Sequence, residues 1–140
     1  MKRFALLPLL LLPLLAQAQQ GETAPELSVD EVRFTVANSE FTLMHEMGHL
    51  LISELQLPVL GREEDAADQL GFMGLFLLQQ EQHRDDFYAK LMDVADYWRL
   101  EWQHAERDGS PVPVWDSHAL DAQRFYNIAC LAYGSDPDRL

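Results

Sequence analysis

Residues 41–80 read FTLMHEMGHLLISELQLPVLGREEDAADQLGFMGLFLLQQ, and their pattern indicates a helical fold. Its apolar residues recur at intervals of three and four, which is the spacing of an amphipathic helix. Pro58 and Gly61 interrupt the pattern and separate two helical segments. Residues 70–78 are apolar all round, which is typical of a helix buried at the centre of a fold. We therefore expect one helix that ends before Pro58 and a second over residues 62–80.

Two further helices are expected after this stretch. Residues 84–106 place Phe, Leu, Val and Trp side chains on one face of a helix and charged side chains on the opposite face. The last helix is predicted to begin at Asp116 or Ser117, which are good N-cap residues, and to end at Gly134. A proline-containing loop, residues 108–115, connects the two helices.

The segment before the first helix predicts the one strand of the chain. Residues 32–36 alternate apolar and polar side chains, which is the period of a strand. Asn38 and Ser39 then offer N-caps for a helix that starts near Phe41. The predicted fold class is mainly α: a compact bundle of about four helices with at most a small N-terminal strand element.

The N-terminus has the pattern of a secretory signal peptide. A basic start precedes an apolar run over residues 4–16, and Ala16-Gln17-Ala18 matches a signal-peptidase site. The run is shorter than the roughly 20 residues that span a bilayer as a helix. We expect a signal peptide at residues 1–18, a flexible leader at 19–30 and a single domain at 31–140. The protein would be periplasmic or secreted, without stable membrane association after cleavage.

Charge and cysteine content restrict the partners. The formal net charge is −13, so nucleic acid is excluded as a partner because its phosphates would be repelled. The same charge attracts cations, including metal ions. Cys130 is the only cysteine of the sequence, and we expect it to be a small buried side chain without an internal disulfide.

Residues 45–49 form the motif that carries chemistry. They read His-Glu-Met-Gly-His, the HExxH pattern, inside a predicted helix. Residues four apart lie on the same face of a helix, so His45 and His49 can bind one metal ion together. Glu46 lies beside the first histidine, where its carboxylate can accept a proton from a metal-activated water.

A zinc site that catalyses hydrolysis needs a third protein ligand. The metzincin extension is excluded, because position 55 is Leu where that class has a third histidine. A carboxylate from the start of the next predicted helix is the other common ligand. Periodicity alone does not decide between Glu63 and Glu64. Asp68 follows Glu64 by four residues, so it shares a face with Glu64 and can support a ligand histidine.

The order HExGH followed by Glu64-x-x-Ala-Asp68 resembles the gluzincin pattern of the prenyl-protein metallopeptidases. Residues 45–69 and 115–137 also resemble a bacterial exported metallopeptidase family that was formerly a domain of unknown function. The resemblance implies a zinc peptidase with His45, His49 and Glu64 as metal ligands and Glu46 as the general base. It also implies that Asp68 supports the site.

A peptidase also needs a group that stabilises the oxyanion of the transition state. His118, at the start of the last predicted helix, is the best candidate as a neutral hydrogen-bond donor. Tyr126 and Arg124 are the next candidates for this role. The alternative reading of His118 is a histidine that begins the core stripe of this helix. The predicted function is an exported zinc-dependent metallopeptidase that hydrolyses bonds in a peptide or protein substrate.

Two other functions stay open. One is a non-catalytic module that binds metal or a partner and retains the zinc site, and the other is a structural helical domain with an accidental motif. A C-terminal truncation also stays open, because the chain ends at Leu140 while the family that it resembles carries more residues there. The motif leaves another divalent metal, the substrate and the oligomeric state undetermined.

Overall fold

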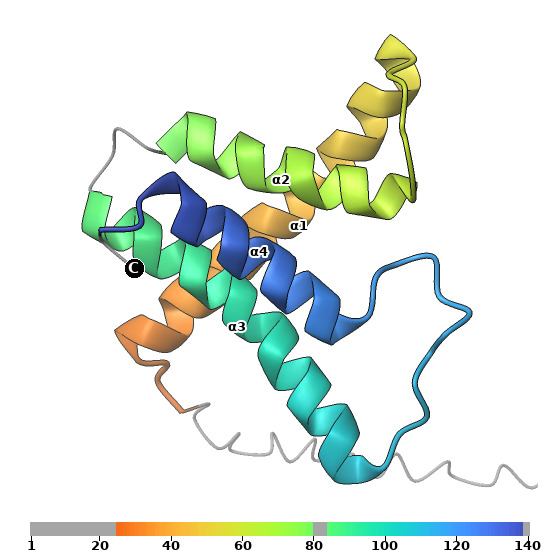
Figure 1. Ribbon diagram of the computed structural model, residues 1–140. Coiled ribbons are helices and arrows are strands. Elements are labelled where there is room, and N and C mark those ends of the chain that lie inside the picture. Colours follow the sequence, from red (N-terminus) through yellow and green to blue (C-terminus); the bar gives the residue numbers. More distant parts are fainter. Residues whose placement is uncertain (1–24, 80–83, 139–140) are drawn as a thin grey trace, which may run out of the picture.

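The computed structural model describes residues 25–79 and 84–138, which form four helices. These are α1 (Val29–Leu55), α2 (Glu63–Gln79), α3 (Arg84–Asp108) and α4 (Asp121–Ser135). The helices α3 and α4 lie side by side, α2 crosses α1, and α1 also packs on α3 (Figure 1). No strand occurs in the described ranges, so the mainly helical fold class is confirmed.

Part of the predicted organisation falls on residues that the structure does not describe. The predicted signal peptide, residues 1–18, and the leader up to residue 24 lie outside the described residues. Among the helices that are described, none has the length and apolar character needed to cross a membrane.

The strand predicted at residues 32–36 is wrong, because α1 already begins at Val29. A capping box starts the helix there: the Ser28 hydroxyl accepts from the Glu31 backbone N–H at 3.2 Å, and the Glu31 carboxylate accepts from the Ser28 N–H at 2.7 Å. The predicted N-caps Asn38 and Ser39 are therefore inside α1. Their side chains instead donate hydrogen bonds to backbone carbonyls one turn earlier.

The start of the last helix also differs from the prediction. α4 begins at Asp121 rather than at Asp116 or Ser117. The Leu120 backbone N–H donates to the Gln123 side chain at 3.2 Å, which satisfies one free donor at this helix end. Residues 109–120 consequently form a long connection from α3 to α4, and His118 lies in this connection instead of in the helix.

The core lies where the four helices meet. Phe87, Leu91 and Val94 are buried on α3, as the predicted stripe requires. The remaining core side chains come from the other helices: Ala37, Phe41, Phe72, Leu75, Ile128 and Ala132. This shared apolar core holds α1, α2 and α4 in fixed positions around the histidine motif.

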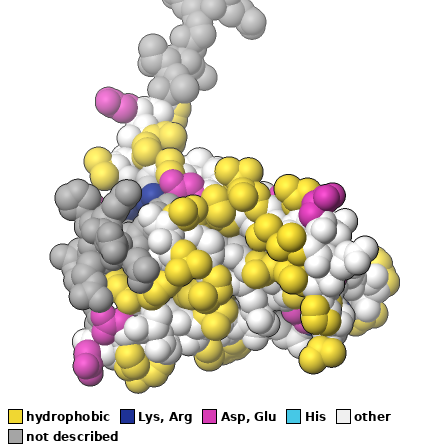
Figure 2. All heavy atoms as spheres, turned by 90° about the horizontal axis from the view of Figure 1, so that it is seen from above, with side chains coloured by type: hydrophobic (Ala, Val, Ile, Leu, Met, Phe, Trp, Pro, Cys, Tyr) yellow, Lys and Arg dark blue, Asp and Glu magenta, His cyan; other side chains and the backbone are white. Residues whose placement is uncertain are grey.

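Two predictions of burial are wrong. The segment 70–78 is not buried all round, because Met73, Leu77 and Leu78 are exposed. Figure 2 shows hydrophobic side chains gathered on the face seen from above, where α2 lies, with few charged ones among them. Cys130 is exposed rather than buried, because α4 turns Ile128 and Ala132 toward the core instead.

Two glycines let α1 and α2 approach closely. A Cβ atom on Gly71 would lie 3.1 Å from the backbone nitrogen of His45, and one on Gly48 would lie 3.1 Å from the Cα atom of Ala67. Both contacts are with backbone, which cannot move aside as a flexible side chain can. Gly48, inside the HExGH motif, therefore has a packing function: it brings the start of α2 over the histidines of α1.

The variant Gly71→Ala is expected to lower the free energy of unfolding by about 1–3 kcal/mol, because the added methyl group forces the two helices apart. Gly134→Ala is the matched control, since a Cβ atom there meets nothing within 4 Å. We expect this control to be neutral or up to about 1 kcal/mol more stable. Denaturant unfolding of both variants gives the comparison, and equal effects would contradict the close approach.

Candidate metal centre

Two imidazoles of α1 and one carboxylate of α2 converge on a single point. The Nε2 atoms of His45 and His49, four residues apart on α1, are 3.2 Å from each other. Glu64, from the first turn of α2, places its Oε2 atom 3.3 Å from the Nε2 atom of His45 and 3.1 Å from that of His49. The His45 side chain is buried and the Glu64 side chain is 20% exposed, so the point lies close below the surface.

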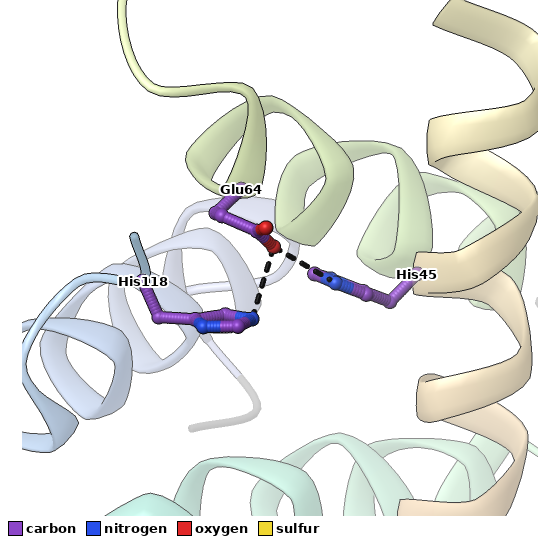
Figure 3. Close-up of side chains that lie close together, drawn as sticks. All are labelled: His45, Glu64 and His118. Atoms are coloured by element: carbon purple, nitrogen blue, oxygen red, sulfur yellow. Dashed lines mark ion pairs between the residues drawn. The ribbon is translucent and has the colours of Figure 1, made fainter. Parts of the chain in front are cut away.

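A third imidazole reaches the same carboxylate. His118, in the connection between α3 and α4, places its Nε2 atom 3.0 Å from Glu64 Oε2. Figure 3 shows the side chains of His45, Glu64 and His118 pointing toward one another from three different segments of the chain. These three side chains could hold a metal ion, since each offers a ligand atom and these atoms lie within 4.8 Å of one another.

The outer nitrogen of each of these imidazoles faces its own carboxylate. His45 Nδ1 is 2.9 Å from Asp68, His49 Nδ1 is 2.8 Å from Glu63, and His118 Nδ1 is 3.0 Å from Asp116. Ionised carboxylates only accept hydrogen bonds, so the Nδ1 hydrogen is assigned to each of these contacts. A neutral imidazole then has a lone pair at Nε2, and three such lone pairs surround Glu64. Metal-binding histidines have this arrangement.

The structure separates the two glutamates between which periodicity could not decide. Glu64 points between His45 and His49, whereas Glu63 lies outside and contacts only the outer nitrogen of His49. The hydrogen bond from Glu63 raises the pKa of His49, and the charge of Glu64 acts in the same direction. Asp68 lies behind His45, at the position expected of a supporting carboxylate.

Arg124 on α4 holds Asp68 in place. Its Nε donates to Asp68 Oδ2 at 2.8 Å, and its Nη2 donates to Oδ1. The guanidinium carbon also lies 3.6 Å from the ring centre of Trp98 on α3, a cation–π contact. Arg124 is predicted as an oxyanion group only after His118, and its contacts in the structure are with Asp68 and Trp98. Tyr126, the other candidate there, is 57% exposed and does not line the cavity at His45.

The ligand atoms suit a small divalent cation. Imidazole nitrogen and carboxylate oxygen are common zinc ligands, with bonds of about 2.0–2.2 Å. Tetrahedral bonds of that length put neighbouring ligand atoms about 3.3–3.6 Å apart. The distances from Glu64 Oε2 to the three Nε2 atoms, and between the Nε2 atoms of His45 and His49, are 3.0–3.3 Å and thus slightly shorter than this value. In the tautomer with the hydrogen on each Nδ1, a cation between these atoms would offset the repulsion between the imidazole lone pairs and the carboxylate. The residues therefore fit a bound metal.

Glu46 lies beside this cluster at the edge of a cavity. The cavity has a volume of about 140 Å³, and its lining includes His45, Glu46 and His118. An adjoining cavity of about 370 Å³ shares Phe41, Thr42 and Trp98 with it and continues along α1 and α3. The Nε1 atom of Trp98 is buried and has no hydrogen-bond partner among the described residues. Trp98 thus lies between Glu46 and the larger of the two cavities.

Comparison with known proteins adds one finding. A family model described as "Putative metallopeptidase" matches residues 13–140 of the chain. No curated protein and no solved structure matches the chain.

Proposed function

The chain belongs to the family described as "Putative metallopeptidase", and we propose that it is an exported, zinc-dependent peptidase of the gluzincin type. Family membership implies a metal cofactor and peptide or protein substrates. The observation that supports a zinc-dependent peptidase of the gluzincin type is the convergence of the His45 and His49 Nε2 atoms on Glu64, beside the cavity at Glu46.

In this proposal His45, His49 and Glu64 hold the zinc ion. Two neutral nitrogens and one carboxylate are a known ligand set of catalytic zinc. Bound zinc polarises a carbonyl group and lowers the pKa of a coordinated water to about 7. Asp68 and Glu63 orient the two imidazoles by accepting their Nδ1 hydrogens.

Glu46 is the general base of the proposed mechanism. Its side chain is exposed to the cavity, and no hydrogen bond to it is found among the described residues, so its carboxylate is available to a water or a substrate. Glu46 accepts a proton as water attacks the scissile carbonyl, and it then delivers this proton to the leaving nitrogen.

The two adjoining cavities are the proposed binding site for the substrate. Their lining combines aromatic rings with hydroxyl and amide groups, from Phe34, Thr35, Asn38, Ser39, Phe41, Thr42, Tyr97 and Trp98. The one cationic side chain among the lining residues is Arg124, and Asp68 already neutralises it. This surface favours uncharged and aromatic substrate side chains over acidic ones.

Export is proposed from the sequence. Residues 1–18 have the pattern of a cleaved signal peptide, and the product would act in the periplasm or outside the cell.

Digestion of a diverse peptide library by the purified protein tests the proposed function. We expect cleavage that a chelator abolishes and that added zinc restores. A folded protein that binds one zinc ion but cleaves no peptide would contradict peptidase function and favour the non-catalytic metal-binding module instead.

The variant Asp68→Asn is expected to lower zinc affinity by about 10–100-fold, because His45 loses the charged partner of its Nδ1 hydrogen. Competition with a chromophoric chelator measures this affinity. Asp65→Asn is the control on the same helix, since Asp65 pairs with Arg62 and not with a histidine. Equal zinc affinities in the two variants would show that Asp68 does not support the site.

A further inference from the structure

His118 has the same geometry toward Glu64 as the two histidines of the HExxH motif. Its Nε2 atom lies 3.0 Å from Glu64 Oε2, against 3.3 Å for His45 and 3.1 Å for His49. These three distances are close to each other and only slightly shorter than the separation of two atoms that bind one zinc ion. The ring of His118 also stacks on that of His45, with 6.0 Å between the ring centres.

The chain fixes this orientation of His118 on two sides. Asp116 accepts a hydrogen bond from the His118 backbone N–H at 2.9 Å and faces the ring Nδ1 atom at 3.0 Å. Arg62, just before α2, donates to the His118 carbonyl at 3.2 Å. The second contact ties the connection between α3 and α4 to the helix that carries Glu64.

The hydrogen-bond pattern argues against the predicted oxyanion role in this arrangement. A neutral imidazole that donates its Nδ1 hydrogen to Asp116 has only a lone pair at Nε2. Such a ring cannot donate to an oxyanion, but it can bind a metal. We infer that His118 is a fourth protein ligand in the resting site, next to His45, His49 and Glu64; this inference rests on the proposed function.

Four protein ligands fill a tetrahedral zinc site, as in structural zinc sites, whereas a catalytic site keeps one position open. A peptidase with this resting site is therefore closed until His118 leaves it. His118 is suited to leave, because it lies in a connection rather than in a helix. Its side chain is also the most exposed of the four, at 38%. It lines the cavity at Glu46, so a substrate that enters this cavity displaces it.

Cobalt substitution tests the inference through the coordination of the metal. The full mature protein, His118→Ala, His118→Gln and the control His104→Ala are loaded with Co²⁺. His104 is a suitable control because it is exposed and pairs with Asp108 on α3. We expect the visible spectrum of a four-coordinate ion in the wild type, and a changed spectrum with about tenfold or weaker affinity in both His118 variants. The control should match the wild type.

Two results would overturn the inference while the proposed function stands. One is that both His118 variants keep the Co²⁺ spectrum and the Co²⁺ affinity of the wild type. The other is that the His118 variants lose about 10²–10³-fold in kcat at unchanged metal affinity, which would identify His118 as an oxyanion donor. Failure of the wild type to bind Co²⁺ or Zn²⁺ would instead overturn the proposed function itself. Circular dichroism of each variant shows whether it is folded.

Discussion

Replacement of Glu46 by glutamine is expected to lower kcat for peptide hydrolysis by about 10²–10⁴-fold, because the amide cannot accept the proton of the attacking water. The bound metal should be retained, since Glu46 is not among the described side chains that converge on Glu64 by hydrogen bond or ion pair. Single-turnover cleavage of a peptide found in the library digest, together with the zinc content of the same sample, measures both effects.

Glu54→Gln is the matched control for this variant. Glu54 is an exposed carboxylate on the same helix, away from the cavity at Glu46. Its replacement should leave both hydrolysis and zinc content unchanged. Hydrolysis retained in Glu46→Gln at the wild-type rate would remove Glu46 from the mechanism, whatever the zinc content.

The variant Arg124→Met is expected to lower the free energy of unfolding by about 3–5 kcal/mol. The guanidinium is buried against the Asp68 carboxylate and the Trp98 ring. Removal of this charge leaves Asp68, itself 13% exposed, without its charged partner. The stability loss should appear in the metal-free protein as well, which denaturant unfolding in the presence of a chelator can show.

Arg33→Met provides the comparison for a more exposed ion pair. Arg33 pairs with Asp93 at 2.7 Å, but its side chain is 32% exposed. We expect a clearly smaller loss of stability there than in Arg124→Met, because solvent screens the pair. If the two arginine variants lose the same stability, Arg124 is not the structural support of Asp68 that its contacts indicate.

The helical class was predictable because a spacing of three and four runs through most of the chain. The start of α1 was not predictable, because five residues that alternate apolar and polar side chains are too few to distinguish a strand from a helix. The capping box at Ser28 and Glu31 decides it. Burial of Ala37 and Phe41, one turn apart, then makes this segment part of a helical face.

Parts of the site that depend on one helix could be predicted from the sequence, whereas parts that depend on the packing of several helices could not. The spacing of His45 and His49 depends only on one helix, so the sequence could predict that they share a face. Their common contact with Glu64 depends on the close crossing of α1 and α2. The position of His118 and the contact of Arg124 with Asp68 depend on how α4 and its connection pack, which no local pattern contains.

Anomalous diffraction at the zinc absorption edge, from crystals of the mature protein grown with zinc, shows directly where zinc binds. We expect one strong peak within about 2.0–2.2 Å of the Nε2 atoms of His45 and His49 and of the Glu64 carboxylate. The absence of a peak at this point in a folded protein, or zinc bound only elsewhere, would show that these residues do not form a zinc site.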